Sequence, residues 1–263
     1  IDNFLPEAEC DQLVQRLNPL LRPTKSPSLH NLVPSAHDES VSTSTVALLT
    51  SISERLWARL QELGSGDEAG RALLRELQTA PEWASRDYHV RHFERGGVAG
   101  DMELRLNAVS DNVRAMRYSA AEPTSTHSAT GDGDKGRERR DETEDDGDFA
   151  TDPRNAHHDG RNRRPAGDSF VTALLYLNSE GADDLTSGQP LEGGHTLFLS
   201  EDGRPVARVS PRKGSLLLFD HHLYHRGERV HRGDKLCVRS DLLYLPCDAR
   251  TGAPMGELFG EGA

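Results

Sequence analysis

The sequence changes character at about residue 100. Before that point, apolar residues recur at the spacing of amphipathic helices. After it, short β-rich segments are separated by glycine, proline and asparagine turn signals. The predicted helices cover about residues 6–21, 44–63 and 67–78, and the predicted strands cover 102–109, 112–118, 170–177, 195–199, 206–209, 215–219 and 235–245. Helices followed by many short strands indicate an α+β chain whose second half is a sandwich or a jelly-roll barrel.

Acidic charge is concentrated in one segment. The 263 residues include 31 lysines and arginines and 43 aspartates and glutamates, which gives a formal net charge of −12. Between Gly131 and Asp152 there are 10 acidic and 4 basic residues, so this stretch carries half of the net charge. It contains one large apolar residue, Phe149, and cannot bury enough surface to offset its ordering entropy. We therefore predict an acidic insertion over residues 128–156, either a solvated loop or a lid or docking segment for a basic partner.

The composition also restricts partners and compartment. A negatively charged chain lacks the basic surface that a general nucleic-acid binder needs, and no stretch approaches the roughly 20 apolar residues of a membrane span. The three cysteines, Cys10, Cys237 and Cys247, form no C-x-x-C pair. Their odd number fits a reducing compartment, which favours the cytoplasm. The sequence starts at Ile1 rather than methionine, which leaves a removed targeting peptide open, and nothing in it fixes the oligomeric state.

A histidine and a carboxylate stand two residues apart just after the acidic segment, at His157 and Asp159. In an extended segment, residues two apart point to the same face, so both side chains can reach one ion. Far downstream, His221, His222 and His225 each offer a third ligand. Two histidines and one carboxylate form the facial triad of non-haem Fe(II) oxygenases, which leaves three coordination positions for co-substrate and O2.

Further motifs surround this constellation in a definite order. They are Val113–Tyr118, Val171–Asn178, Gly193–Phe198, Val209–Phe219, His225–Val230, Gly233–Lys235 and Arg239–Tyr244, and the chain opens with Asp2–Leu5 and Glu9–Cys10. The series resembles the prolyl 4-hydroxylase-like branch of the Fe(II)- and 2-oxoglutarate-dependent oxygenases, most closely over residues 112–245. The sequence departs from that pattern at the acidic insertion, which stands where the family has a short connection.

The resemblance implies an α+β fold with a double-stranded β-helix (jelly-roll) core flanked by N-terminal helices. Residues 1–263 would form a single oxygenase domain, with 1–100 as mainly helical support and 101–250 as the jelly-roll core. The insertion 128–156 would lie within that domain, because segments on both sides of it contribute to the same site.

The resemblance also implies a metal centre and its co-substrate. His157, Asp159 and His225 match the family's iron ligands. Lys235 lies ten residues after His225, where the family keeps a basic residue for the distal carboxylate of 2-oxoglutarate. A cation at that position makes physical sense, because a buried carboxylate must be paired. The implied cofactors are Fe(II) and 2-oxoglutarate, with ascorbate as a further candidate.

Five more residues receive roles in the same way. Tyr176 and Tyr118 match tyrosines of the co-substrate pocket, and Thr196 stands where a pocket-lining side chain is expected. Arg239 and Arg161 are candidate substrate contacts, and they hint at an anionic or carboxylate-bearing substrate.

These assignments have structural alternatives. The two tyrosines are equally readable as core aromatics, and Arg239 as an ion-pair partner of Asp241 or of the insertion. His222 is the main rival to His225 as third ligand, although it would move Lys235 three positions further away. The remaining histidines of this region are expected to be neighbours of the site rather than ligands: His158, His195 and His221.

The implied reaction is hydroxylation of an unactivated C–H bond, coupled to conversion of 2-oxoglutarate to succinate and CO2. The presence of Asp159 disfavours halogenation, because the related halogenases leave the carboxylate position empty. The alternatives are a catalytically inactive jelly-roll binding module, which the intact ligand set disfavours, and a zinc hydrolase, for which no H-E-x-x-H motif is present. Fold and triad do not select the substrate, so a small molecule and a peptidyl proline both stay open.

Overall fold

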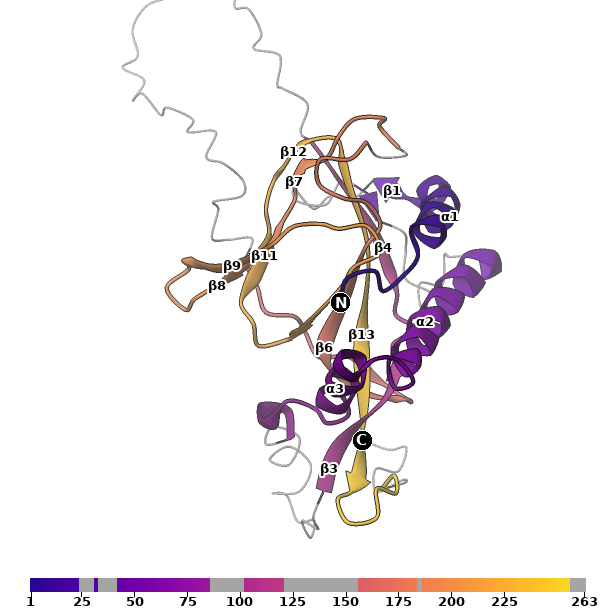
Figure 1. Cartoon of the computed structure of the whole chain (residues 1–263), viewed down its shortest axis with the longest axis vertical. Coiled ribbons are helices and arrows are strands. Elements are labelled where there is room, and N and C mark those ends of the chain that lie inside the picture. Colours follow the sequence, from indigo (N-terminus) through magenta and orange to yellow (C-terminus); the bar gives the residue numbers. More distant parts are fainter. Residues whose placement is uncertain (24–30, 33–41, 86–101, 121–155, 184–185, 256–263) are drawn as a thin grey trace, which may run out of the picture.

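The computed structural model describes residues 1–23, 31–32, 42–85, 102–120, 156–183 and 186–255 (Figure 1). The predicted acidic insertion, apart from its last residue, lies outside the described residues. Within the described part, no helix has the length and apolarity to cross a membrane. All three cysteines are buried free thiols.

Helices dominate the first part of the chain, as predicted: α1 (Glu7–Leu17), α2 (Thr43–Leu63) and α3 (Glu68–Leu77). The Ser42 side chain accepts a hydrogen bond from the Thr45 amide at the start of α2, and Asp67 caps α3 in the same way. The apolar spacing predicts that the first helix continues to residue 21, and this is wrong. It ends at Leu17 and a 3-10 turn (η1, Asn18–Leu20) follows, because Pro19 has no N–H to continue an α-helix.

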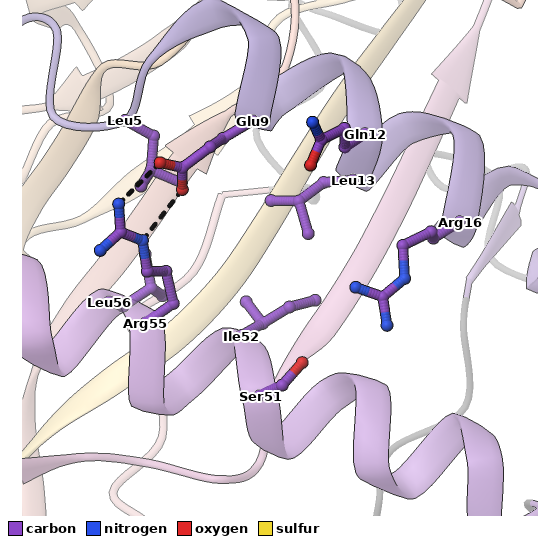
Figure 2. Close-up of a pocket in the computed structure, with 9 residues that line it drawn as sticks. All are labelled: Leu5, Glu9, Gln12, Leu13, Arg16, Ser51, Ile52, Arg55 and Leu56. Atoms are coloured by element: carbon purple, nitrogen blue, oxygen red, sulfur yellow. Dashed lines mark hydrogen bonds and ion pairs between the residues drawn. The ribbon is translucent and has the colours of Figure 1, made fainter.

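Helices α1 and α2 face each other across a shallow pocket, shown in Figure 2. Leu5, Leu13 and Ile52 line it, and a two-pronged ion pair closes one end. In that pair the Arg55 guanidinium donates to both Glu9 carboxylate oxygens, over 2.6 and 2.9 Å. Because both side chains are partly exposed, the pair adds orientation more than stability.

The main strands of the larger sheet are β3 (Met102–Val109), β4 (Arg114–Ser119), β6 (Gly167–Tyr176), β10 (Leu216–Asp220) and β13 (Asp234–Asp248). Three two-residue strands also belong to it: β1 (Arg22–Pro23), β2 (Asn31–Leu32) and β5 (Arg163–Arg164). The order is β1-β2-β4-β13-β6-β10, with β3 on β13 and β5 on β6, and every pairing is antiparallel. β13 pairs with β4 through its first residues, with β6 through its middle and with β3 through its end. It is therefore the strand that joins the rest of the sheet.

Two smaller sheets complete the strand half. One has the order β11-β8-β9, formed by His225–Gly227, Thr196–Leu199 and Pro205–Val209. The other pairs β12 (Val230–Arg232) with β7 (Glu192–Gly193). All seven predicted strands are present; the strand 102–109 has the predicted bounds, and the other six have shifted ends. The pattern misses the strands of two or three residues, β1 (Arg22–Pro23), β2 (Asn31–Leu32), β5 (Arg163–Arg164), β7, β11 and β12, because so few residues show no alternation.

The two faces of the larger sheet pack against different parts of the molecule. Helices α1 and α2 lie on one side of β13, and the β8–β9–β11 sheet lies on the other (Figure 1). Leu236, Val238 and Leu242 of β13 belong to the main core that includes the helices. Cys237 belongs instead to a small cluster with Tyr176 and Phe219. Because alternate strand residues share a face, we define the inner face of β13 as Lys235, Cys237, Arg239 and Asp241. Facing antiparallel sheets with helices outside are the predicted jelly-roll arrangement, which is confirmed.

Candidate metal centre

Backbone pairing brings the two predicted histidine ligands together. His157 forms an isolated antiparallel bridge with His225, the first residue of β11. The two amides donate to each other's carbonyls over 2.9 and 3.1 Å, and the ring centroids are 4.6 Å apart. Asp159 follows two residues later, on the same face of the extended segment. The extended segment places His157 and Asp159 on one face, and the backbone bridge brings His225 beside them.

The ligand atoms of His157, Asp159 and His225 all lie within 4.8 Å of one another. The Nε2 atoms of the two histidines are 3.8 and 3.7 Å from the Asp159 carboxylate. The side chains of Asp159 and His225 are 4% and 9% exposed, whereas that of His157 is 58% exposed. Two imidazoles and one carboxylate suit an Fe(II) site with open positions, and the cluster opens to solvent beside His157.

His225 is held in the form that a metal requires. Its Nδ1 lies 2.8 Å from the Leu223 carbonyl, which makes Nδ1 the donor and leaves the Nε2 lone pair facing Asp159. The Phe219 ring packs against the imidazole, at 4.6 Å between centroids. Burial lowers the pKa of His225, and the charges of His157 and Arg239 lower it further, against Leu223 and Asp159, which raise it. The neutral imidazole is therefore favoured.

Asp159 is fixed through both carboxylate oxygens. The Thr172 hydroxyl, on β6, donates to Oδ2, and Nη2 of Arg239, on β13, lies 2.7 Å from Oδ1. The sequence predicts Arg239 as a candidate substrate contact, with an ion pair to Asp241 as the alternative. The structure places it between two carboxylates, because Asp241 Oδ1 is 3.6 Å from the same Nη2.

The predicted co-substrate residues gather at the other end of the inner face of β13. Lys235 is 5% exposed, and its Nζ is 5.5 Å from the centre of the Tyr118 ring and 5.4 Å from that of Tyr176. Tyr176 shares a hydrogen bond of 2.8 Å with Thr196. Burial raises the pKa of both tyrosines, so they remain neutral phenols. No carboxylate of the described residues lies within 4 Å of the Lys235 ammonium, and burial lowers its pKa.

Gly194 permits the close packing around this lysine. Its φ is +73°, a left-handed conformation that costs glycine little. A β-carbon there would meet Val230 at 3.1 Å and the Lys235 side chain at 3.2 Å. The glycine pair before Thr196 therefore lets β8 approach the buried end of the site.

Arg161 lies apart from the metal cluster in its contacts. Its guanidinium pairs with Asp168 of β6 and sits 5.0 Å from the centre of the Phe170 ring. Arg239, the other predicted substrate arginine, forms an ion pair with Asp159 of the metal cluster.

The other histidines of the region take different partners. His222, the rival third ligand, stacks on Trp83 with ring centroids 3.5 Å apart, and His158 packs on Tyr224 at 5.1 Å. His195 lies between the carboxylates of Glu180 and Glu228. Among the described residues, only His157, Asp159 and His225 form a cluster able to hold a metal.

Two polar residues next to the site were not predicted. Thr172 donates to Asp159, and the Asn162 side chain donates to Asp241 over 2.7 Å. His221, predicted as a neighbour of the site, has its imidazole Nε2 3.4 Å from Asp241. Thr172 could have been found from the alternation of β6, because it has the same parity as Tyr176. Asn162 lies in a turn-rich segment with no such signal.

Two histidines and one carboxylate are the facial triad that is typical of non-haem Fe(II) oxygenases. Residues 150–240 match the family model described as the 2OG-Fe(II) oxygenase superfamily. The matched segment contains His157, Asp159, His225 and Lys235, and the match supports the predicted Fe(II)- and 2-oxoglutarate-dependent oxygenase. No curated protein matches the sequence.

Several solved structures are similar to the chain at low identity. A prolyl-4-hydroxylase from Pseudomonas putida is 16% identical with a TM-score of 0.40, covering 92% of this chain and 89% of its own. HygX from Streptomyces hygroscopicus, with nickel, 2-oxoglutarate and hygromycin B bound, is 15% identical with a TM-score of 0.41, covering 92% and 81%. A prolyl hydroxylase from Trichoplax adhaerens, in complex with a hypoxia inducible factor peptide, is 14% identical with a TM-score of 0.43, covering 92% and 81%. What those proteins bind does not transfer to this chain.

Proposed function

We propose that His157, Asp159 and His225 bind Fe(II), that Lys235 binds the distal carboxylate of 2-oxoglutarate, and that the chain hydroxylates an unactivated C–H bond. The substrate class is a small molecule or a peptidyl residue. Two features carry this proposal: a compact ligand cluster with one exposed histidine, and a buried ammonium with no carboxylate of the described residues within 4 Å.

The residues present fit these cofactors. The donor set of two imidazoles and one carboxylate suits Fe(II), with positions left for ligands. A buried cation is costly unless it is paired, and a dicarboxylate supplies that pairing. When bound, the metal and 2-oxoglutarate supply the oxidative chemistry: with O2 they yield succinate, CO2 and a hydroxylated substrate.

The chain's own residues supply position and shielding. The Leu223 carbonyl holds the His225 tautomer, and Thr172 holds the Asp159 carboxylate. At the buried end, Tyr176 and Thr196 share a hydrogen bond beside Lys235, and their hydroxyls can reorient to donate to a carboxylate. Buried apolar side chains, among them Phe219 and Cys237, pack beside these groups and contribute shielding.

The test is binding without O2, on wild type and His157→Ala. We expect wild type to bind Fe(II) and 2-oxoglutarate, and His157→Ala to lose more than about 100-fold in metal affinity, because losing a ligand costs more than losing an outer contact. His158→Ala is the matched control, since His158 is the neighbouring imidazole outside the cluster. Unchanged binding in His157→Ala would falsify the ligand assignment.

The reaction is tested separately. Under O2, wild type should convert 2-oxoglutarate to succinate in an Fe(II)-dependent manner, and a substrate screen can then follow succinate yield. Absence of any conversion in protein that binds both cofactors would favour the inactive binding module instead.

We also propose a reducing, cytoplasmic location, supported by the three free cysteines.

A further inference from the structure

Two charged residues on the inner face of β13 have no role in the proposed function. Arg239 lies between the carboxylates of Asp159 and Asp241, at 2.7 and 3.6 Å from the same Nη2 atom. All three side chains are largely buried, with exposures of 23% for the arginine and 4% for each aspartate. One guanidinium therefore serves two buried carboxylates, and one of these belongs to the metal cluster.

This sharing matters because Arg239 and a metal ion attract the same carboxylate. In a partly buried site, a cation 2.7 Å from Asp159 competes with any divalent ion for its negative charge. A second carboxylate beside the arginine reduces that competition, because it offers the guanidinium another acceptor. The affinity of Asp159 for a metal ion thus depends on how strongly the second carboxylate attracts Arg239.

Asp241 is built to remain in place. Its Oδ2 accepts a hydrogen bond of 2.7 Å from Nδ2 of the Asn162 side chain, and its Oδ1 is 3.4 Å from His221 Nε2. It lies directly opposite Thr172 in the β13–β6 register, and Thr172 is the residue that donates to Asp159. The two aspartates are therefore tied to the same pair of neighbouring strands.

We propose that Asp241 is a positioning residue, which shares Arg239 with Asp159 and so keeps the Asp159 carboxylate available to a divalent cation. This inference rests on the proposed role of Asp159 as a metal ligand. It predicts that the loss of Asp241 weakens metal binding through Arg239, although Asp241 is outside the metal cluster.

The first measurement is the affinity for Co(II) alone, without 2-oxoglutarate or O2. Asp241→Asn keeps the shape of the side chain and removes its charge, and we expect it to bind Co(II) about tenfold more weakly than wild type, the scale typical of residues behind metal ligands. Asp168→Asn is the matched control. Asp168 is also a largely buried, arginine-paired aspartate of the same sheet, and it lies outside the metal cluster. Equal Co(II) affinity in wild type and folded Asp241→Asn would overturn the proposal.

The second measurement repeats the substitution in an Arg239→Gln background. If Asp241 acts through the arginine, the single variant Arg239→Gln should bind Co(II) at least as tightly as wild type, and adding Asp241→Asn should then change affinity by less than about twofold. An equal loss in both backgrounds would mean that Asp241 acts directly by its charge, which contradicts the proposal. Tenfold weaker binding by Arg239→Gln would contradict the competition on which it depends.

Asn162→Ala keeps the proposal testable if Asp241→Asn does not fold. It removes one hydrogen bond to Asp241 and leaves the charge in place, so we expect about twofold to threefold weaker Co(II) binding, and no change would count against the idea. The proposed function fails differently. In that case wild type does not bind Co(II), or His157→Ala binds it equally well, whereas failure of this inference alone leaves the His157 dependence intact.

Discussion

The two cations on the inner face of β13 stand four residues apart and have opposite surroundings. Lys235 is enclosed by aromatic rings, with no carboxylate of the described residues within 4 Å. Arg239 has two carboxylates, Asp159 and Asp241, within 3.6 Å. A buried charge without a partner costs free energy in the protein without ligand, and a ligand of opposite charge offsets that cost when it binds. A buried charge with protein partners needs no ligand and can instead hold those partners in place.

The largest contrast between the two cations should appear in 2-oxoglutarate binding. Lys235→Met removes the ammonium proposed to pair with the distal carboxylate, and we expect about 100-fold weaker 2-oxoglutarate binding, as is typical when one partner of a buried charge pair is lost. Arg239→Gln should change that affinity by less than about threefold. Calorimetric titration in the presence of Co(II) measures both, and similar losses in the two variants would show that Arg239 also contacts the co-substrate.

Loss of the lysine, which weakens co-substrate binding most, should not lower the stability of the protein without cofactors, whereas loss of an Arg239 partner should lower it. Lys235→Met removes a buried, unpaired charge and should leave the free energy of unfolding unchanged or raise it. Asp241→Asn weakens charge-assisted contacts to Arg239 and His221 and should lower it by about 2 kcal/mol. Denaturant unfolding in the presence of a chelator checks both, and a destabilised Lys235→Met would indicate that the lysine is structural.

The Asp241 effect should depend on pH in a defined direction. Burial by itself raises the pKa of this carboxyl, but His221 and Arg239 outweigh burial and hold the pKa below the ordinary 3.8. A depressed folded-state pKa contributes stability that is fully present above the unfolded value and is lost as the pH falls through the folded value. The difference in unfolding free energy between wild type and Asp241→Asn should therefore be constant from about pH 7 to pH 5 and shrink below about pH 3.8. A difference that grows on acidification would contradict this reasoning.

A smaller effect on Co(II) affinity should measure what the Thr172 hydroxyl contributes to holding Asp159. Thr172→Val removes the hydroxyl that donates to Oδ2, and we expect about fivefold weaker Co(II) binding, in line with the loss of one hydrogen bond to a charged group. Thr172→Ser keeps the hydroxyl and should restore most of the affinity. If the valine and serine variants bind equally, packing around Asp159 matters more than the hydrogen bond.

Sequence reasoning could reach the fold and the metal cluster because each depends on a short pattern. Alternation defines the long strands, and the spacing of His157 and Asp159 sets their common face. The choice of His225 over His222 needed the resemblance, and the structure shows its physical basis in the backbone bridge to His157. The sharing of Arg239 was beyond reach, since it depends on side-chain distances across β13, β6 and the segment around Asn162.

The central position of β13 has a consequence for how the protein folds. This strand, residues 234–248, pairs with β3, β4 and β6, which come from segments up to more than a hundred residues earlier in the chain. Such pairings require closure of long loops, which makes folding slow relative to helical proteins of the same size. During synthesis the earlier strands emerge first and have to wait for β13, with their edges unpaired and prone to association. Because Lys235 and Arg239 arrive on that same strand, the sheet and the charged lining of its interior are completed in one step.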